Sequence, residues 1–487
     1  MLLTQPFNTL KRDINYQTVY TIMKQSGKRL GFALVMLWMV TGLSAQPNTV
    51  SLEDAISYAI NNSTSTQNAR LNISDAEAQI IERRSTGLPQ LNGSVNFQHY
   101  LKVPVQPLPE NFQTFGVVFA DLMPYLSEST RQLLLEQNSG DDSGGVAFVL
   151  KNNLTASLNL ESMIFDGSYF VGLQAARAYR KYAAVDLAVK EREVRNQVID
   201  AYYPVLLVDE NLELLEKNIT NLERLHFETE ELYKAGFAEQ LDVDRLELSL
   251  TNLQTERDNL LRQKELAIAG LKFAMNYPQD SELEVTGDLD EMIVEAPAGS
   301  LTDAVNFQRR PEIGLIDEAL QLNELNIRVN KMGYLPSLRG FATYQQSYFG
   351  NDLKNGFWAP AAFVGLTLNV PIFDGFNKKA KIQRAQLDLE EAINQRNELV
   401  QAISFEVESA RTSYMNAQER LANQQKNLEL AERIYQTTQV KYREGVGSSL
   451  EVSQAEQSLY TTQSNYMQAM YDLVVARANL EKALNIQ

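Results

Sequence analysis

Cysteine is absent from the 487-residue sequence, and histidine occurs only twice, as His99 and His226. Without cysteine there can be no disulfide bond, no thiol nucleophile, no cysteine zinc site and no lipid anchor on a cysteine at a cleavage site. Two histidines leave little material for metal binding or general-base catalysis. Together with the lack of a credible catalytic set, this composition leads us to predict a protein that is not an enzyme and has no catalytic residue, cofactor or metal site.

Positive charge and long hydrophobic runs are also scarce. Lysine and arginine total 44 against 61 aspartates and glutamates, which gives a formal net charge of -17. Such an acidic surface repels phosphate and argues against nucleic acid as a partner. Downstream of residue 45 no segment reaches the ~18 consecutive apolar residues of a transmembrane helix. If the chain crosses a membrane, it therefore does so without helices.

The N-terminal segment has the pattern of a secretory signal peptide. Three basic residues follow Met23, an apolar run covers residues 30–40, and small residues lead to Ala45. We predict a signal peptide over residues 1–45, with Met23 as the true start and the preceding residues as an upstream extension. An uncleaved membrane anchor is the alternative.

Apolar or small residues recur at steps of three and four from Val400 to Tyr442. This heptad seam, with one polar break, is far longer than the three or four heptads that define a coiled coil. No proline or glycine interrupts residues 376–444. A helix of roughly 65 residues would span on the order of 100 Å, which is too long for a compact core.

The same seam occurs from Val194 to Tyr233, at positions a constant 209 residues earlier. A further apolar repeat follows each seam, at residues 246–271 and 455–480. Each copy is therefore predicted to be a long helix, a tight turn and a return helix of ~35 residues.

Alternation with period two follows two Leu-Pro pairs, at residues 88–89 and 335–336. One face of each predicted strand is apolar and the other carries small polar side chains, which suits the wall of a membrane β-barrel. A half-buried sheet in a soluble domain is the alternative; the signal peptide and the long helices favour the barrel. The predicted strands cover residues 91–98, 153–160, 338–344 and 364–370.

Both strand pairs end in Ile-Phe-Asp-Gly, at residues 164–167 and 372–375. Because aspartate can cap a helix and glycine can turn, each strand is expected to lead directly into a long helix. Between the paired strands we expect an exposed surface loop over residues 100–150 in the first unit and a loop of about 20 residues in the second.

These elements divide the chain into a first repeat, residues 46–276, a linker, residues 277–300, and a second repeat, residues 301–487. A short helix with a serine cap is expected to open each repeat, at Ser51 and at Ser300. The linker and these short opening helices are expected to form a collar around the helical body.

Four strands per chain cannot close a membrane barrel, because the smallest known barrels have about eight. An open sheet edge in lipid leaves backbone groups unpaired at a cost of several kcal/mol each. If the strands lie in a membrane, several copies must pool them.

The two-fold repeat, the Ile-Phe-Asp-Gly junctions and the Tyr-x-x-Gly turns at residues 233–236 and 442–445 resemble the TolC-type outer-membrane efflux factor family. The resemblance covers residues 51–485. It implies a mainly α fold with a small membrane β-barrel portion, in which a homotrimer pools four strands per chain and long coiled-coil hairpins form a periplasmic tunnel. The implied function is that of an outer-membrane channel in a tripartite efflux or type I secretion system. The implied partners are a periplasmic adaptor (membrane fusion protein), an inner-membrane pump of RND or ABC type, and outer-membrane lipid.

The resemblance also implies where the chain meets its adaptor, at the two turns between long and return helices. Glycine permits the tight reversal, and the small or apolar residues after it can seat in an adaptor groove. Alternatively, the first glycine of each turn is only a helix C-cap. The six predicted docking residues are Gly236, Phe237, Ala238, Gly445, Val446 and Gly447.

At the pore entrance the resemblance implies an acidic position at Glu451 and a gate tyrosine at Tyr442. Asp242 and Asp244 are the nearest acidic candidates in the other hairpin, unless they belong to a solvated face. A ring of carboxylates would favour cations and could bind divalent ions that block the pore. Gln454 and Gly447 depart from the family pattern, which argues against a doubled acidic ring and against the family's arginine latch.

Two other function classes compete with a conduit. A trimeric coiled-coil adhesin or envelope spacer would normally carry its strands at the C-terminus, whereas here a strand pair lies inside each repeat. An envelope hydrolase lacks a credible catalytic set, since residues 142–145, Asp-Ser-Gly-Gly, are far from either histidine in the sequence and have the composition of a flexible loop.

Overall fold

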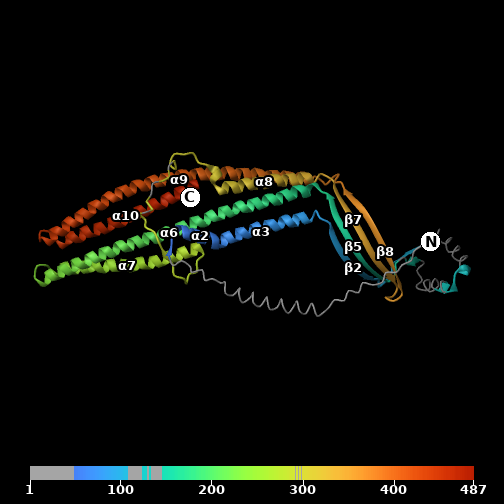
Figure 1. The fold of residues 1–487 in the computed structure, drawn as a ribbon, viewed down its shortest axis with the longest axis horizontal. Helices are drawn as coiled ribbons and strands as arrows, with labels where there is room; N and C mark the ends of the chain where they lie inside the picture. The colour runs from blue at the N-terminus through green and yellow to red at the C-terminus, as the bar shows by residue number, and fades with distance from the viewer. Residues whose placement is uncertain are drawn as a thin grey trace, which may run out of the picture.

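The protein is a long rod with a β-sheet toward one end and two helix-to-helix turns at the other (Figure 1). The predicted signal peptide, residues 1–45 with Met23, lies outside the described residues, as does most of the predicted loop 100–150. The computed structural model describes residues 49–107, 123–128, 131–132, 145–147, 149–290, 292–293, 296–297 and 299–486.

Two helical hairpins form most of the rod. The long helices α6 (Gly167–Lys234) and α9 (Asn377–Arg443) have 68 and 67 residues, and the return helices α7 (Gln240–Met275) and α10 (Ser449–Leu484) have 36 residues each. These lengths agree with the prediction from the heptads, and Pro204 lies inside α6 without ending it. No described helix combines the length and apolar character needed to cross a bilayer.

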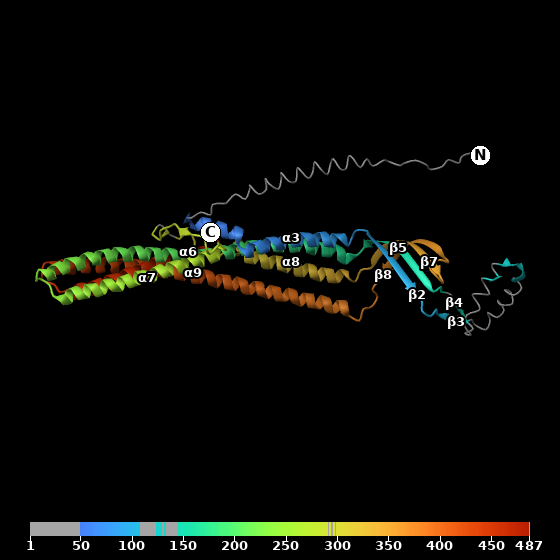
Figure 2. The ribbon, with the colours of Figure 1, turned by 90° about the horizontal axis from the view of Figure 1, so that it is seen from below.

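Shorter helices lie along the half of the rod that adjoins the sheet (Figures 1 and 2). Helices α3 and α8 flank α6, and α8 also packs against α9. These helices are α2 (Leu52–Asn62), α3 (Thr64–Ser85), α8 (Pro311–Met332) and the 3-10 helix Phe307–Arg309. Another 3-10 helix, Met123–Tyr125, lies between the second and third described strands after α3.

The heptad seams form the core between the helices. Ile403, Val407 and Tyr414 of α9 are buried against Leu473 and Leu480 of α10. The corresponding part of α6 is buried against α2, α7 and the linker. Because the seam residues recur every three or four positions, one stripe of each helix is buried along much of its length.

Four strands form one antiparallel sheet in the order β2-β5-β7-β8. The register places Leu160 opposite both Leu91 and Ala342, and Ala342 opposite Val364, so apolar residues of all four strands share one face. Within the described residues, β2 and β8 each have a partner on one side only. The bounds are β2 Gln90–His99, β5 Asn152–Phe165, β7 Ser337–Gly350 and β8 Gly356–Asn369.

Side-chain hydrogen bonds cross the opposite, polar face of this sheet. Ser94 Oγ lies 2.8 Å from Ser157 Oγ, and Thr343 Oγ1 donates to Asn159 Oδ1 at 2.9 Å. Short strands form two further pairs, β1 (Thr49–Val50) with β6 (Glu284–Val285) and β3 (Val105–Pro107) with β4 (Gly145–Ala147).

The predicted loop of about 20 residues in the second unit is wrong, because only residues 351–355 separate β7 from β8. Aromatic pairs extend the ladder: the Tyr348 and Trp358 ring centroids lie 5.3 Å apart. Asp352 closes the turn by accepting from the backbone N–H of Lys354 at 2.8 Å and of Asn355. Cross-strand packing therefore continues the hairpin beyond the alternating stretch.

The first strand-to-helix junction is as predicted, but the second differs. Asp166 caps α6 by accepting from the backbone N–H of Ser168 at 2.9 Å. After β8, residues 370–376 have no regular structure, and α9 begins only at Asn377. The change of direction occurs at Gly375 and Phe376, which both have positive φ.

The expected short helix at Ser300 is also wrong. Residues 299–303 form a turn, in which Gly299 has a φ of +81° and its carbonyl accepts from Asp303 N–H at 2.8 Å. The buried Arg411 of α9 donates to the backbone carbonyls of Ser300 and Asp303. This arginine therefore satisfies carbonyls that a helix would have used internally.

Candidate functional site

The first candidate surface is the turn between α6 and α7. Gly236 has a φ of +81°, which L side chains rarely adopt, and Phe237 N–H donates to Leu232 O at 2.8 Å. These bonds end α6 in a Schellman-type cap. The side chain of Phe237 is 83% exposed, so the cap presents an aromatic ring to the solvent.

The turn between α9 and α10 repeats this geometry. Gly445 has a φ of +74°, and Val446 N–H donates to Lys441 O at 3.0 Å. Val446 is 78% exposed, and a Cβ on Gly447 would lie only 3.1 Å from the Cβ of Lys441. The structure thus places the six predicted docking residues at two tips with similar backbone geometry, in which Gly236 and Gly445 supply the left-handed residue after each helix C-cap.

Polar contacts join the two hairpins just behind these tips. Ser449 Oγ of α10 donates to Asp242 Oδ1 of α7, and Arg245 Nη1 donates to Ser449 Oγ at 3.0 Å. An ion pair of 3.0 Å links Arg443 of α9 to Glu228 of α6. The tips are therefore held to one another by side chains from all four helices.

The four predicted pore-entrance residues lie in different environments. Asp242 is engaged twice, since its Oδ2 also accepts from Glu239 N–H at 3.2 Å at the start of α7. Asp244 is exposed and accepts from Gln240 Nε2 at 2.6 Å. Glu451 is an exposed residue in the first turn of α10. Asp244 and Glu451 therefore have the solvent access that an acidic lining needs, whereas Asp242 ties the hairpins together.

Tyr442 is half-buried beside an apolar cluster that includes Leu222, Leu246 and Val452 from three other helices. Burial raises the pKa of its phenol, and the charge of Asp242 acts in the same direction. The structure therefore brings Tyr442 and Asp242 together at the meeting point of both hairpins.

The sequence analysis missed Glu456, an acidic residue in the same region. Its side chain is only 2% exposed, and Tyr460 Oη donates to its Oε1 at 2.7 Å. Burial raises the pKa of this carboxyl. Its position four residues after Val452 and three before Leu459 places it on the buried stripe, which is a signal available in the sequence.

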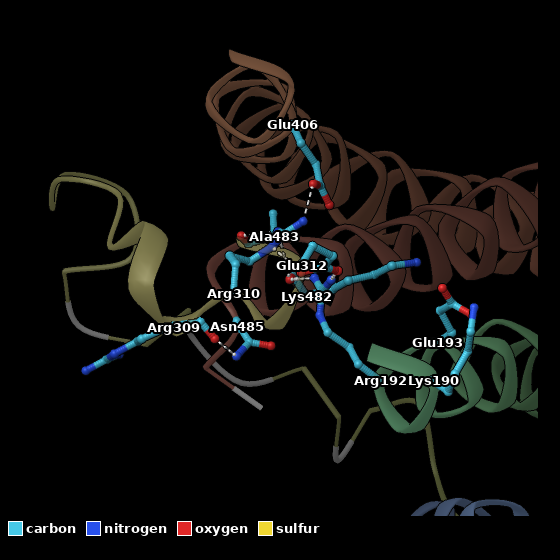
Figure 3. A network of polar contacts seen from close by, with 10 residues as sticks. All are labelled: Lys190, Arg192, Glu193, Arg309, Arg310, Glu312, Glu406, Lys482, Ala483 and Asn485. Carbon is cyan, nitrogen blue, oxygen red and sulfur yellow. Dashed lines mark hydrogen bonds and ion pairs between the residues drawn. The ribbon is translucent and has the colours of Figure 1, made fainter. Parts of the chain in front are cut away.

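A second polar network, also missed, lies where α6, α8, α9 and α10 meet (Figure 3). The buried Arg310 donates to the carbonyl of Ala483 at 2.6 Å and to Glu406 Oε2 at 2.7 Å. Arg192 of α6 donates to the carbonyl of Lys482 at 2.6 Å and to Glu312. Two arginines thus donate to carbonyls at the end of α10, where a helix runs out of its own N–H donors.

The described residues contain no cluster of three or more histidine, aspartate or glutamate side chains placed to hold a metal ion. The residues at the tips are caps, apolar groups and carboxylates. Such an arrangement can dock a protein and bias the passage of ions.

A family model for the outer membrane efflux protein matches residues 307–485. The second half of the chain is therefore similar to the outer membrane efflux protein family. The matched segment starts at the 3-10 helix before α8 and runs to the end of α10, so it includes β7, β8, α9 and the second tip. The resemblance inferred from the repeats is thereby confirmed.

Individual known proteins match a larger part of the chain. The pyoverdine export outer membrane protein OpmQ of Pseudomonas aeruginosa is 23% identical over 373 residues, covering 75% of this chain and 77% of OpmQ. The alkaline protease secretion protein AprF of the same organism is 20% identical over 337 residues, covering 68% of this chain and 69% of AprF.

The open-state structure of the Neisseria gonorrhoeae MtrE outer membrane channel has the same fold, with a TM-score of 0.65 at 19% identity, over 89% of this chain and 88% of MtrE. The mainly helical fold with a small sheet is therefore that of outer-membrane efflux channels. The family is one of channel-forming proteins and not of enzymes.

Proposed function

We propose that the chain is the outer-membrane channel of a tripartite export system and conducts small molecules or proteins to the exterior. The observation that carries this proposal is the open four-stranded sheet, apolar on one face and polar on the other. In lipid, its two unpaired edges would each cost several kcal/mol per backbone group. A barrel of pooled strands satisfies those groups and encloses a polar lumen.

Three copies, as in the family that the chain resembles, would supply twelve strands from four per chain. The helices continue this arrangement as a tunnel in the periplasm. Large apolar side chains support contact between copies, because they are exposed on helices at opposite edges of one chain: Leu71 and Ile81 on α3, Leu387 and Phe405 on α9. Such exposure is typical of surfaces that bind another protein.

The two tips are proposed to dock a periplasmic adaptor, which in turn binds an inner-membrane pump of RND or ABC type. Phe237 and Val446 supply exposed apolar groups on rigid caps, as a groove-filling contact requires. Tyr442, Asp242, Asp244 and Glu451 lie just behind them and are proposed as the pore entrance.

Electrical recording in planar bilayers tests the conduit directly. The detergent-extracted protein is expected to have the mass of a trimer and to conduct ions. A trimer that does not conduct would instead favour an adhesin or envelope spacer, and a water-soluble monomer would refute both.

Photo-crosslinking tests the docking surface. A photoreactive amino acid at Phe237 or Val446 is expected to capture a periplasmic protein in cells. The same group at Leu266, an exposed apolar residue of α7 away from the tips, serves as the control. Equal capture at all three positions would contradict docking at the tips.

A further inference from the structure

The apolar face of β8 continues beyond the end of the strand. Alternate residues from Val364 to Val370 are large, apolar and exposed, and Ile372, the next in phase, is 93% exposed. The strand itself ends at Asn369. The chain therefore keeps a period-two apolar stripe through a stretch with no sheet to support it.

The turn that follows holds a phenylalanine in an unfavourable backbone conformation. Phe376 has a φ of +67°, next to Gly375 at +64°. A bulky residue in the left-handed region is an outlier that points to a constraint from function. The Phe373 and Phe376 rings are both exposed and meet edge to face with centroids 5.5 Å apart.

A basic cluster follows the aromatic pair at once: Lys378, Lys379, Lys381 and Arg384 fall within seven residues of a chain whose net charge is -17. Lysines in the first turn of a helix oppose its macrodipole, so helix stability does not explain them. Lys378 pairs with Asp374 at 3.1 Å, whereas no ion pair to a described residue occurs for the other three, which are exposed.

We propose that residues 370–384 form an anchor at the membrane interface that binds anionic phospholipid headgroups of the periplasmic leaflet. Ile372, Phe373 and Phe376 would enter the boundary of the acyl chains, where aromatic rings are favoured. Lys379, Lys381 and Arg384 would bind the phosphates, since basic residues beside a bilayer are attracted to anionic lipid. The inference rests on the proposed function in one respect, namely that the apolar sheet face contacts lipid.

Tryptophan quenching tests the anchor, because the chain has only Trp38 and Trp358. Trp358 lies on the apolar face at the other end of β8. In W38F, Trp358 reports on the sheet; in W38F/W358F/I372W, the new tryptophan reports on the anchor. Both proteins are reconstituted in vesicles of phosphatidylcholine and phosphatidylglycerol, with bromine on the acyl chains of one lipid at a time.

Both reporters are expected to be quenched. At position 372, brominated phosphatidylglycerol is expected to quench more strongly than brominated phosphatidylcholine, which indicates a preference for the anionic lipid. Each neutralised basic residue should weaken that preference about five-fold, so K379Q/K381Q/R384Q abolishes it. The matched control K426Q/R433Q/K441Q removes the same charge from exposed sites near the other end of α9 and should leave it unchanged. Higher salt should weaken the preference by screening.

The possible failures are distinguishable. Equal quenching at position 372 by both lipids would overturn the headgroup site while leaving the barrel intact. Quenching of Trp358 but not of position 372 would mean that another copy covers the stripe, which also overturns the anchor. If neither reporter is quenched, the sheet is not in lipid and the proposed function itself fails.

Discussion

Glu451 and Glu456 lie five residues apart on α10, and their carboxylates have very different environments. Five residues turn an α-helix by about 140°, so the two side chains leave α10 on different faces. Glu451 is exposed near the proposed pore entrance, whereas Glu456 is buried and accepts a hydrogen bond from Tyr460. The same chemical group is therefore suited to bias ions at one position and to respond to pH at the other.

The E456Q variant should become increasingly more stable than the wild type as the pH rises. Burial raises the folded-state pKa of Glu456 above its ordinary value of 4.5, so the folded state holds this proton more tightly than the unfolded state. Stability is therefore lost as pH rises from about 4.5 through the folded pKa, by roughly 1.4 kcal/mol for each unit of the shift. The difference in melting temperature between E456Q and the wild type should grow across that window.

Two features make this comparison specific to Glu456. Burial raises the pKa of the neighbouring Tyr435 to about 12, so that residue stays neutral throughout the window. E451Q, which removes an exposed carboxyl from the same helix, is the matched control. A constant difference between E456Q and the wild type at every pH would contradict the assignment.

Replacing Glu451 by glutamine should raise the permeability of the proposed channel to anions. Carboxylates at a narrow entrance attract cations and repel anions, and three copies would contribute three charges. The reversal potential in asymmetric salt measures this selectivity. Unchanged selectivity in E451Q would remove Glu451 from the pore entrance.

At the scale of elements, the long helices and strands were predictable, but the length of the β7–β8 hairpin and the junction from β8 to α9 were not. The stripe through Ile403, Val407 and Tyr414 is visible as a local periodicity, and so is the alternation in β5 and β8. The length of the β7–β8 hairpin depends instead on pairs such as Tyr348 and Trp358, which come together only in three dimensions. Periodicity alone carries no information about such contacts.

The same limit applies to the candidate sites. The tips were predictable because Gly236 and Gly445 stand where two heptad repeats meet, a pattern that resembles a known family. The roles of Arg310 and Arg411 were not, because each satisfies backbone carbonyls far away in the sequence. An isolated arginine in a sequence gives no sign of the helix end it will cap.

Replacing Arg310 by alanine should destabilise the junction of α8, α9 and α10. The substitution leaves the carbonyl of Ala483 and the carboxylate of Glu406 without this donor, at a cost of about 3 kcal/mol. Arg309 is exposed, so R309A is a matched control with an expected change within about 0.5 kcal/mol. Chemical denaturation compares the two; equal effects would show that the network in Figure 3 does not stabilise the fold.

At the scale of the whole molecule, a single chain leaves several surfaces without a binding partner. Among the described residues its sheet has two open edges, its outer helices expose large apolar residues, and its tips present apolar groups on rigid caps. Other copies of the chain can pair with the sheet edges and cover the outer helices. An adaptor can bind the tips. The relatives OpmQ and AprF differ in what their names say they export, so the fold alone does not select a cargo.

Disulfide crosslinking across the open edges tests the pooling of strands most directly, since the native chain has no cysteine. Within one chain β5 and β7 separate β2 from β8 by roughly 14 Å, beyond the ~7 Å reach of a disulfide. The register across the sheet runs from Ser94 through Ser157 and Gln345 to Ala361, so Ser94 and Ala361 lie on the same face at the same height along the strands. S94C is therefore combined in turn with A359C, A361C or F363C. At least one pair is expected to give reducible trimers in native membranes, and none larger. Monomers alone from all three pairs, or an open ladder of larger species, would contradict a barrel built from three copies.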